Sequence, residues 1–458
     1  MIQIPSWELI KKYDRPGPRY TSYPTAPEWT EAFGPPQYAQ HLERADGDTG
    51  PLSIYVHLPF CREMCRFCGC NVIATHDRSR ADAYLDVLEK EVALVAGRLP
   101  RRRTVSQLHW GGGTPTFLDE KQLERCHAIL ARHFTFAKDA EKAIEIDPAI
   151  TTRSQIETLA RLGFNRISMG VQDFDTRVQE TVGRIQGEKE TADLVKAARD
   201  NGFRGVNLDL IYGLPYQSPD TWKQTLERIL HIHPDRMAVF GFAYVPWSKP
   251  HQRLLPQEAL PKTEQRVELF LGAVEAFTRA GYRLIGLDHF ALESDELAVA
   301  QSGGYLYRNF QGYTVRPADD TVAFGMTSIS DIGGAYAQNA HKLKDWAEKV
   351  EAGTVPVERG ASMTPDDVLR RFSINRVMCL LRLDLREIAK RFGPEARTAI
   401  EGDLRAGVEE LKADGLVTFD GDVLQVTPLG QLLVRNVAML FDAYLKKAGG
   451  KKQFSRTV

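Results

Sequence analysis

Strand-like and helix-like segments alternate regularly along the first half of this chain. The helix-like segments carry apolar residues three or four positions apart, as in ADAYLDVLEKEVALVAGRL (81–99). The strand-like segments are LSIYVHL (52–58), VSQLHW (105–110), KAIEID (142–147), NRISMGV (165–171), GVNLDLIYG (205–213) and RMAVFGF (236–242). Repeated β–α units join parallel strands through right-handed crossovers. The alternation therefore predicts an α/β protein with a parallel sheet.

The residues that point to a site lie directly after these strands. The positions are Cys61 onward, Gly111–Thr114, Asp147, Gln172 and Leu214. In a barrel of β–α units the site lies at the carboxyl ends of the strands. We therefore expect a partial (β/α)6, TIM-like barrel, with a doubly wound open sheet as the alternative.

The stretches on either side of the barrel have a different character. Residues 1–50 are rich in Pro and Tyr without a clear period, which indicates an extended N-terminal arm. The barrel is expected over 51–290, followed by a connecting or barrel-covering segment over 291–363. Residues 364–458 predict a mostly helical domain with a small wing-like hairpin in KADGLVTFDGDVLQVT.

Charge and composition argue against two classes of partner. The chain has 59 Lys and Arg against 60 Asp and Glu, which gives no overall attraction to nucleic acid or membrane. No predicted helix of the winged segment bears a basic stripe, so no nucleic-acid partner is expected. No stretch approaches 18 apolar residues, and the N-terminus is charged too early for a signal peptide. We expect a cytoplasmic protein, and the sequence gives no reason to require an oligomer, so a monomer is expected.

Four of the six cysteines lie in CREMCRFCGC (61–70), immediately after the first strand. In a reducing compartment such a cluster indicates metal or redox chemistry. Zinc sites usually have two paired knuckles, and this chain has no second pair, although His76 could complete a tetrad. Three thiolates can instead hold three irons of a [4Fe–4S] cluster and leave the fourth iron open.

The spacing of Cys61, Cys65 and Cys68 resembles the signature of the radical S-adenosylmethionine (SAM) superfamily. Phe67, between the second and third of these cysteines, fits the same pattern. The resemblance implies a [4Fe–4S] cluster whose open iron is chelated by SAM. Cys70 would then be the cysteine that does not bind iron.

Other polar and glycine residues lie where the following strands end. HWGGGTPT (109–116) lacks the Lys of a phosphate-binding loop, and its glycines would let the backbone approach a ligand. Glu145 could accept from a hydroxyl or an ammonium group, or could be a structural acid. Gln172, Arg184 and Asp209 are three different polar groups expected on one rim.

The chain as a whole closely resembles the family of oxygen-independent coproporphyrinogen III oxidases. The resemblance lies in YVHLPFCREMCRFCGCN, LHWGGGTPT, FNRISMGVQDF, NLDLIYGLP, the arm GPRYTSYPTA and the ending QFSRTV. It implies that Cys61, Cys65 and Cys68 bind the cluster. It implies a SAM molecule at the open iron, contacted by Tyr55, Gly112, Glu145 and Ile329. It implies a second SAM site lined by Phe67, Gly113, Thr114, Gln172, Arg184, Asp209 and Ala243.

The implied reaction is the oxidative decarboxylation of two propionate side chains of coproporphyrinogen III to vinyl groups, giving protoporphyrinogen IX. It needs a low-potential electron donor and an electron acceptor that the sequence does not identify. The alternative is a radical SAM homologue that binds or delivers haem, or that modifies another tetrapyrrole. The presence of Cys70 and of the Pro- and Tyr-rich arm favours the oxidase.

Further residues are candidates on their chemistry alone. Tyr55 and His57 alternate with apolar residues on the first strand, so both side chains are expected inside the barrel near the cluster. We take these two and Cys70 as candidate catalytic residues. A substrate with four carboxylates needs cationic and hydrogen-bonding partners. The candidates for that role are Arg15, Arg19, Tyr20, Tyr23 and Arg308.

Overall fold

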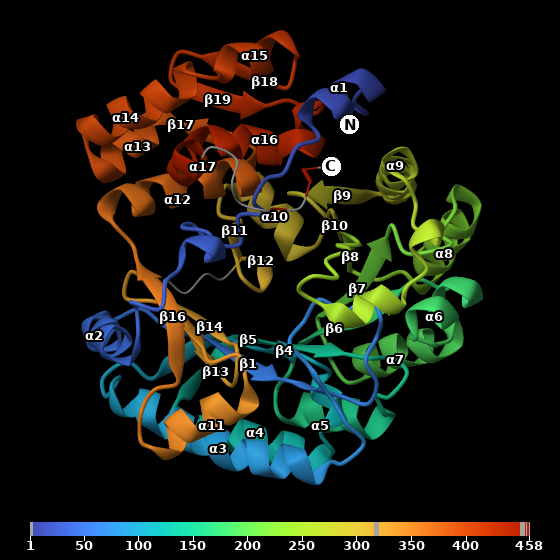
Figure 1. Cartoon of the computed structure of the whole chain (residues 1–458), viewed down its shortest axis with the longest axis vertical. Coiled ribbons are helices and arrows are strands. Elements are labelled where there is room, and N and C mark those ends of the chain that lie inside the picture. Colours follow the sequence, from blue (N-terminus) through green and yellow to red (C-terminus); the bar gives the residue numbers. More distant parts are fainter. Residues whose placement is uncertain (1–2, 316–319, 449–453, 455, 458) are drawn as a thin grey trace. The chain divides into compact units, whose positions relative to one another are not determined.

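The computed structural model describes residues 3–315, 320–448, 454 and 456–457 (Figure 1). The chain divides into two compact units, each assembled from separate stretches. Unit 1 comprises Met1–Trp29, Arg283–Val315 and Met363–Val458. Unit 2 comprises Thr30–Tyr282 and Arg316–Ser362.

Unit 2 is built on the six parallel strands that the sequence predicts. They are β1 (Leu52–Leu58), β4 (Thr104–Gly112), β5 (Thr135–Ile146), β6 (Arg166–Gln172), β7 (Gly205–Tyr212) and β8 (Arg236–Gly241). Each pairs in parallel with the next in this order. The strands therefore follow one another across the sheet as in a barrel, and their carboxyl ends lie along one rim.

Helices connect these strands and pack against one another in chain order. They are α3 (Ser79–Gly97), α4 (Glu120–Ala131), α5 (Arg153–Arg161), α6 (Thr176–Val182), α7 (Glu188–Asp200), α8 (Pro219–Ile232) and α9 (Thr263–Arg279). Contacts join α3 to α4, α4 to α5, α5 to α7, α7 to α8 and α8 to α9. Such a continuous row of helices covers one face of the sheet, as Figure 1 shows for α3 to α5. A doubly wound sheet would instead divide its helices between both faces, so the partial barrel is the correct alternative.

The sheet continues beyond the other edge of β1. β13 (Asp320–Phe324) pairs with β1 in parallel, and β14 (Ile329–Ile332), β15 (Ala335–Asn339) and β16 (Val357–Ser362) follow as an antiparallel meander. The helices α2 (Pro35–Ala45) and α11 (Leu343–Glu351) also belong to unit 2, as does the short parallel pair β2 (Phe60–Cys61) and β3 (Ile73–Ala74).

Unit 1 is mostly helical, as predicted for its C-terminal part. Its helices are α1 (Trp7–Tyr13), α10 (Glu296–Gly303), α12 (Pro365–Leu380), α13 (Leu385–Phe392), α14 (Pro394–Arg405), α15 (Val408–Ala413), α16 (Val434–Ala438) and α17 (Ala443–Ala448). Its strands are β10 (His289–Leu292), β11 (Tyr307–Asn309), β12 (Gly312–Thr314), β17 (Arg382–Asp384), β18 (Val417–Asp420) and β19 (Val423–Val426). β9 (Tyr282–Ile285) starts at the boundary between the units. Short 3-10 turns cover Ala26–Glu28, Pro115–Phe117, Pro250–Leu254, Gln257–Ala259, Gly430–Leu433 and Met439–Phe441.

Two local expectations are corrected. The predicted wing-like hairpin is present as β18 and β19, but β17 pairs with β19 and adds a third strand to it. The stretch 1–50 was expected to be extended, yet it contains α1 and α2. Ser6 caps α1 by accepting from the Leu9 N–H at 3.2 Å, and prolines occupy the first turn of α2.

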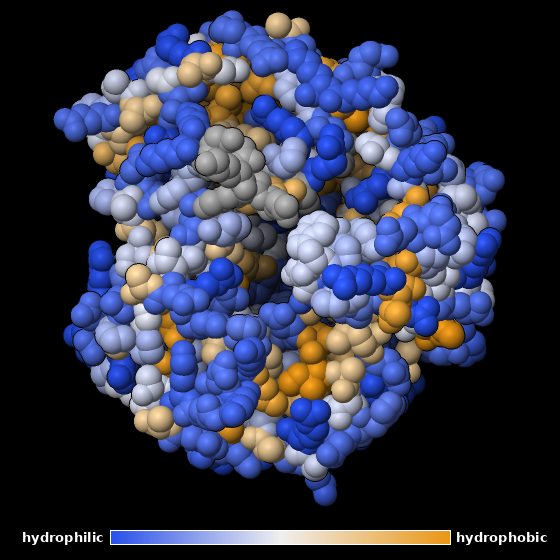
Figure 2. All heavy atoms as spheres, viewed as in Figure 1, coloured by the Kyte–Doolittle hydropathy of each residue, from blue (hydrophilic) through white to orange (hydrophobic). Residues whose placement is uncertain are grey.

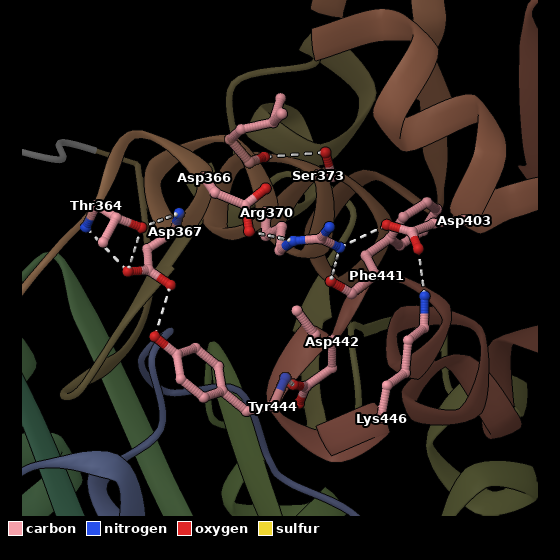
Figure 3. Close-up of polar contacts among 12 residues, drawn as sticks. Thr364, Asp366, Asp367, Arg370, Ser373, Asp403, Phe441, Asp442, Tyr444 and Lys446 are labelled. Carbon is pink, nitrogen blue, oxygen red and sulfur yellow. Dashed lines mark hydrogen bonds and ion pairs between the residues drawn. The ribbon is translucent and has the colours of Figure 1, made fainter. Parts of the chain in front are cut away.

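Tyrosines of the arm belong to the core of unit 1. Tyr13, Tyr20 and Tyr23 are buried with apolar residues of α12, α14, α16 and β19. Polar contacts tie α12 to its neighbours in the same unit (Figure 3). Arg370 pairs with Asp403 of α14 at 2.5 Å and donates to the Phe441 carbonyl at 3.0 Å.

Hydrophilic residues cover most of the face shown in Figure 2, and hydrophobic residues form small groups among them. Among the described residues, no helix has both the length and the hydrophobicity needed to cross a bilayer. In the part of the chain that the structure describes, the exposed large hydrophobic side chains are Ile4, Ile185, Trp247, Leu254, Val299, Tyr305 and Val368.

Candidate active site

The four clustered cysteines lie on a loop that leaves the carboxyl end of β1. Backbone hydrogen bonds close the base of this loop, from Ile73 N–H to the Pro59 carbonyl at 2.7 Å and from Thr75 N–H to the Cys61 carbonyl at 2.9 Å. Cys61, Cys65 and Cys68 are partly buried, and Cys70 is exposed. The loop therefore presents three thiols at the carboxyl rim of the sheet.

The thiols contact the rest of unit 2 in different ways. Cys61 Sγ lies 3.5 Å from Thr114 Oγ1, and Arg184 Nη1 donates to Cys65 Sγ at 3.9 Å. Burial raises the pKa of Cys61 to about 11 and shifts the pKa of Cys65 in the same direction. A hydrogen bond from the Cys70 thiol lowers the pKa of Cys68. Binding to iron would stabilise all three as thiolates.

This donor set fits a [4Fe–4S] cluster. None of the six cysteines forms a disulfide, so all three thiols of the motif are available as ligands. In the part of the chain that the structure describes, no three His, Cys, Asp or Glu side chains converge on one ion position. A cluster needs no such convergence, because each thiolate binds a different iron.

A segment after β8 holds the cysteine loop from the other side. Lys249 Nζ donates to the Cys70 carbonyl at 2.9 Å, and His251 Nε2 lies 2.8 Å from the Cys68 carbonyl oxygen. Gln252 is fully buried, and its Nε2 donates to the carbonyls of Phe67 at 3.0 Å and Ala243 at 3.1 Å. Two of the predicted cofactor residues, Phe67 and Ala243, are thereby linked through one side chain.

Sequence reasoning missed this segment because PWSKPHQ has no regular period. Its position offered a signal, since it follows the sixth strand and so lies at the same rim as the other candidates. Polar residues that follow a barrel strand are candidates for the site whether or not they form a motif, because the strand ends there at the site rim.

Tyr55 and His57 lie together on the side of β1 that was predicted to face the site. Tyr55 Oη is 3.2 Å from His57 Nδ1, and His57 Nε2 is 3.0 Å from the Asn71 carbonyl oxygen on the cysteine loop. Burial lowers the pKa of His57, which favours the neutral imidazole. The Tyr55 ring also stacks on His109, at 5.8 Å between ring centroids.

His109 and Glu145 bring the glycine loop into the same group of contacts. Glu145 Oε1 lies 3.0 Å from His109 Nε2, and Glu145 Oε2 accepts from the Gly112 N–H at 3.2 Å. Burial raises the pKa of Glu145, but these hydrogen bonds outweigh it, so the pKa lies below its usual value. Glu145 is therefore an ionised acceptor at neutral pH. His109 was not predicted, although it alternates with apolar neighbours at the end of β4.

The structure gives a reason for Gly112 and Gly113 that differs from the predicted one. A Cβ at Gly112, whose φ is +113°, would lie 2.6 Å from His57 Nδ1. A Cβ at Gly113 would lie 2.6 Å from the Pro59 carbonyl carbon. The N–H of Gly113 donates to the Leu58 carbonyl at 2.8 Å. Close packing against β1 therefore requires glycine here, before any approach to a ligand is considered.

Arg184 connects the cysteine loop with the ends of β5 and β6. Its guanidinium lies 3.1 Å from Asp147 Oδ2, and its Nη2 donates to the Gly170 carbonyl at 2.7 Å. Gln172 has a φ of 66° at the end of β6. A Cβ at Gly170 would lie 2.7 Å from Gln172 Nε2 and 3.0 Å from Arg184 Nη2, so both side chains extend over the same point.

Asp209 lies on the neighbouring strand, where its backbone is in register with Gly170. Its carboxylate accepts from Ser168 Oγ at 2.9 Å and from Asn207 Nδ2 at 2.7 Å. Asp209 is thus held by polar side chains of β6 and β7 at the level of Gln172.

Ile329 begins β14, opposite Gln338 of β15. The segment before it is bound to the end of β1 through Tyr84, whose hydroxyl donates to the His57 carbonyl at 2.7 Å and accepts from the Met326 N–H at 3.1 Å. Gly325 precedes this contact with a φ of +95°. The structure therefore brings the Ile329 segment to the strand that carries Tyr55 and His57.

Comparisons with known proteins identify the family and agree with the fold. A model of the radical SAM superfamily matches residues 55–229, and a model of the HemN C-terminal domain matches residues 363–433. The fold and the cysteine loop thus define a radical SAM protein. Two bacterial proteins named oxygen-independent coproporphyrinogen III oxidase align over nearly the whole length. The one from Synechocystis is 42% identical, covering 99% of this chain and 98% of its own, and the one from Escherichia coli is 43% identical, covering 100% of both.

A solved structure titled coproporphyrinogen III oxidase (HemN) from Escherichia coli, a radical SAM enzyme, superimposes with a TM-score of 0.91. It is 43% identical, and the match covers 97% of this chain and 100% of that one. The chain belongs to the family of oxygen-independent coproporphyrinogen III oxidases.

Proposed function

We propose that this chain catalyses the oxygen-independent oxidative decarboxylation of coproporphyrinogen III in haem biosynthesis. Two propionate side chains become vinyl groups, and the product is protoporphyrinogen IX. The observation that carries the proposal is full-length similarity to oxidases of this name, together with a three-thiol loop at the end of β1. The cluster and SAM, when bound, would supply the radical chemistry that removes a hydrogen atom from the propionate side chain.

We assign the cofactor contacts from the resemblance to the family. Cys61, Cys65 and Cys68 hold the [4Fe–4S] cluster. The residues that contact the SAM at the cluster are Tyr55, Gly112, Glu145 and Ile329. The residues that line a second SAM site are Phe67, Gly113, Thr114, Gln172, Arg184, Asp209 and Ala243. Contacts among most of these residues within unit 2 support the assignment.

Charge and hydrogen bonding suggest how single residues act. The ionised Glu145 carboxylate, held by His109 and the Gly112 N–H, accepts from an ammonium or ribose hydroxyl of SAM. The Arg184 guanidinium, held by Asp147, offers a positive charge to a carboxylate. Tyr55 and His57 adjoin the cysteine loop that carries Cys70, and we take all three as the residues that act on the reacting propionate.

The reaction defines further partners. Reductive cleavage of SAM consumes one electron, so we propose a low-potential electron donor. Loss of CO2 after hydrogen abstraction leaves one electron on the substrate, so an electron acceptor is also required. We further propose that the protein acts as a monomer in the cytoplasm, where thiols stay reduced and all six cysteines remain free.

The proposal is tested by anaerobic reconstitution with iron and sulfide, followed by SAM, a reductant, an electron acceptor and coproporphyrinogen III. We expect 5′-deoxyadenosine and protoporphyrinogen IX, measured by chromatography after oxidation to the porphyrins. Cleavage of SAM without any vinyl product would contradict the oxidase function. Tight haem binding without turnover would favour a haem-binding homologue instead.

A further inference from the structure

We propose that a small pocket inside unit 1 binds a carboxylate, and that this carboxylate is a propionate of the tetrapyrrole substrate. The pocket lies between arm residues 20–23, Arg308 of β11, and Arg371 and Asn375 of α12. Its volume of about 10 Å³ leaves room for a group the size of one water molecule, such as a single carboxylate oxygen. The identity of the ligand rests on the proposed function, whereas its chemical class follows from the pocket.

The charge of the pocket favours an anion. Arg308 and Arg371 both line it, and none of its lining residues, all of which the structure describes, is acidic. Guanidinium groups bind carboxylates through charge-assisted, often bidentate hydrogen bonds. Ser22, which is itself buried, adds a hydroxyl group to the same lining.

Arg308 is a buried cation with hydrogen-bonding capacity to spare. Its exposure is 7%, its Nη1 donates to the Arg19 carbonyl, and its guanidinium carbon lies 5.2 Å from the centre of the Tyr313 ring. Its Nε is buried and has no hydrogen-bond partner among the described protein atoms. A buried donor without an acceptor is costly, so the Arg308 guanidinium, which lines the pocket, keeps hydrogen-bonding capacity that the fold does not use.

The two arginines are held in place before any ligand arrives. Arg371 and Asn375 are four residues apart on α12 and so share one helix face. Arg371 Nη2 donates to Tyr307 Oη at 2.8 Å, and Asn375 Nδ2 donates to the Arg308 carbonyl at 3.2 Å. These contacts fasten β11 to α12 and hold the Arg371 guanidinium, while the Arg19 carbonyl holds that of Arg308, which reduces the entropy lost on binding.

The other residues predicted to recognise the substrate carboxylates are engaged elsewhere in unit 1. Their polar groups already have partners within the fold, so these residues stabilise the folded structure of unit 1. The partners are Asn436 Oδ1 for Arg15 (2.9 Å), Asp288 for Arg19, Asp442 for the Tyr20 hydroxyl (3.0 Å) and the Ala443 N–H for the Tyr23 hydroxyl (3.0 Å). Of the predicted set, Arg308 is the one whose structure points to a ligand.

The test is a binding titration with the reconstituted full-length protein under anaerobic conditions. The probe is coproporphyrin III, the stable oxidised form of the substrate, followed by its fluorescence. Arg308→Gln and Arg371→Gln should each raise its Kd about tenfold or more. Arg386→Gln is the matched control, because Arg386 lies exposed on α13 of the same unit and pairs with Asp384. Its Kd should stay within twofold of the wild type.

Ligand and variant controls separate a carboxylate contact from a folding defect. The tetramethyl ester of coproporphyrin III lacks charge, so its binding should not distinguish Arg308→Gln from the wild type. Circular dichroism and SAM cleavage in the absence of substrate report the fold and the cofactor site. If Arg308→Gln does not fold, the Kd for coproporphyrin III is measured with Arg371→Gln and with Arg308→Lys, which keeps the charge.

Two results would overturn the proposal. One is an unchanged Kd for coproporphyrin III in folded Arg308→Gln and Arg371→Gln. The other is an equal loss for the acid and for its ester, since the arginines would then act without a carboxylate. If sodium acetate alone stabilises the wild type but not Arg308→Gln, while porphyrin binding does not change, the pocket takes a free carboxylate and the assignment to the substrate is wrong.

The proposed function can fail separately. The wild type could form no protoporphyrinogen IX and still bind coproporphyrin III in an Arg308-dependent way. That result would support the carboxylate pocket and contradict the oxidase function. If the wild type is active and neither arginine substitution changes the Kd for coproporphyrin III, the oxidase function is supported and the carboxylate pocket is contradicted.

Discussion

At the scale of single residues, the spacing of the cysteine motif predicts which three cysteines bind iron but does not predict a role for Cys70. It lies two positions after Cys68, is exposed, and hydrogen-bonds to the Cys68 thiol. Its backbone carbonyl is anchored by Lys249 at 2.9 Å. We assign the iron-binding role to the three partly buried thiols and place Cys70 at the border of the site.

Alanine substitutions test that assignment. Cys61→Ala, Cys65→Ala and Cys68→Ala should each abolish the visible absorption of the reconstituted cluster and lower its iron content, because each removes one of three protein ligands. Cys70→Ala is the matched control within the same loop and should retain the cluster. Loss of iron from the Cys70 variant to the same extent as from the others would contradict the three-ligand assignment.

At the scale of secondary-structure elements, a buried acid of α3 holds the segment that leads to Ile329. Glu91 accepts from the Gly325 N–H at 2.8 Å, from Asn339 Nδ2 at 2.6 Å and from Trp346 Nε1 at 3.0 Å. It thereby joins α3 to the end of β13, to β15 and to α11. Burial raises the pKa of Glu91 to about 7 even though these three donors oppose the shift.

The raised pKa of Glu91 predicts a pH-dependent stability. Below about pH 4.5 the carboxyl is neutral in both the folded and the unfolded chain, and its contribution is fully present. As pH rises from about 4.5 to 7 the unfolded chain loses the proton first, so the free energy of unfolding falls, by about 3 kcal/mol in total. Glu91→Gln cannot ionise and should show a shallower fall in denaturant titrations between pH 5 and pH 8.

Glu89 supplies the control on the same helix. It lies at the surface, where it pairs with Arg132, so Glu89→Gln should keep the wild-type pH dependence. If the Glu91 variant and the wild type lose stability equally between pH 5 and pH 8, Glu91 is not the group responsible.

At the scale of the whole molecule, the first and last parts of the chain meet in unit 1. The Arg435 side chain is buried and donates to the carbonyls of Gly17 and Pro18, and Thr457 N–H donates to the Arg15 carbonyl at 2.8 Å. Figure 3 shows Asp442 beside Tyr444, close to the contacts of α12. The N-terminal arm is therefore held within unit 1 by contacts with the C-terminal part of the chain.

The pair formed by Tyr20 and Asp442 tests how the arm is held. Tyr20→Phe removes the hydroxyl that donates to Asp442 Oδ2 at 3.0 Å and leaves a buried carboxyl short of a partner. We expect a loss of about 1–3 kcal/mol in local stability, seen as faster hydrogen exchange and proteolysis of residues 15–24. Tyr305→Phe, at an exposed tyrosine of the same unit, should leave both unchanged. Equal protection in the two variants would show that packing alone holds the arm.

Local pattern was enough to predict the six parallel strands and their order, whereas the site at their carboxyl ends remains a prediction. Each strand and helix has a period that its own residues display, and the cysteine motif occupies a single short loop. The partial barrel could be predicted for that reason, and the family was predicted from the resemblance of several long motifs to a known family. The predicted division into four contiguous segments remains a prediction. The two compact units of the structure are each assembled from separate stretches, and a pattern along the sequence can define only contiguous segments.

What only the tertiary structure decided concerns residues far apart along the chain. Gln252 joins Phe67 to Ala243, Glu91 holds Gly325, and Arg308 meets the arm residue Arg19. None of these pairs shares a period or a motif. The sequence by itself determined the elements and the chemistry of the cysteine loop, since both arise from neighbours in the chain. The contacts that shape the site and the carboxylate pocket arise when folding buries polar groups, because each must then find a partner wherever the topology brings one.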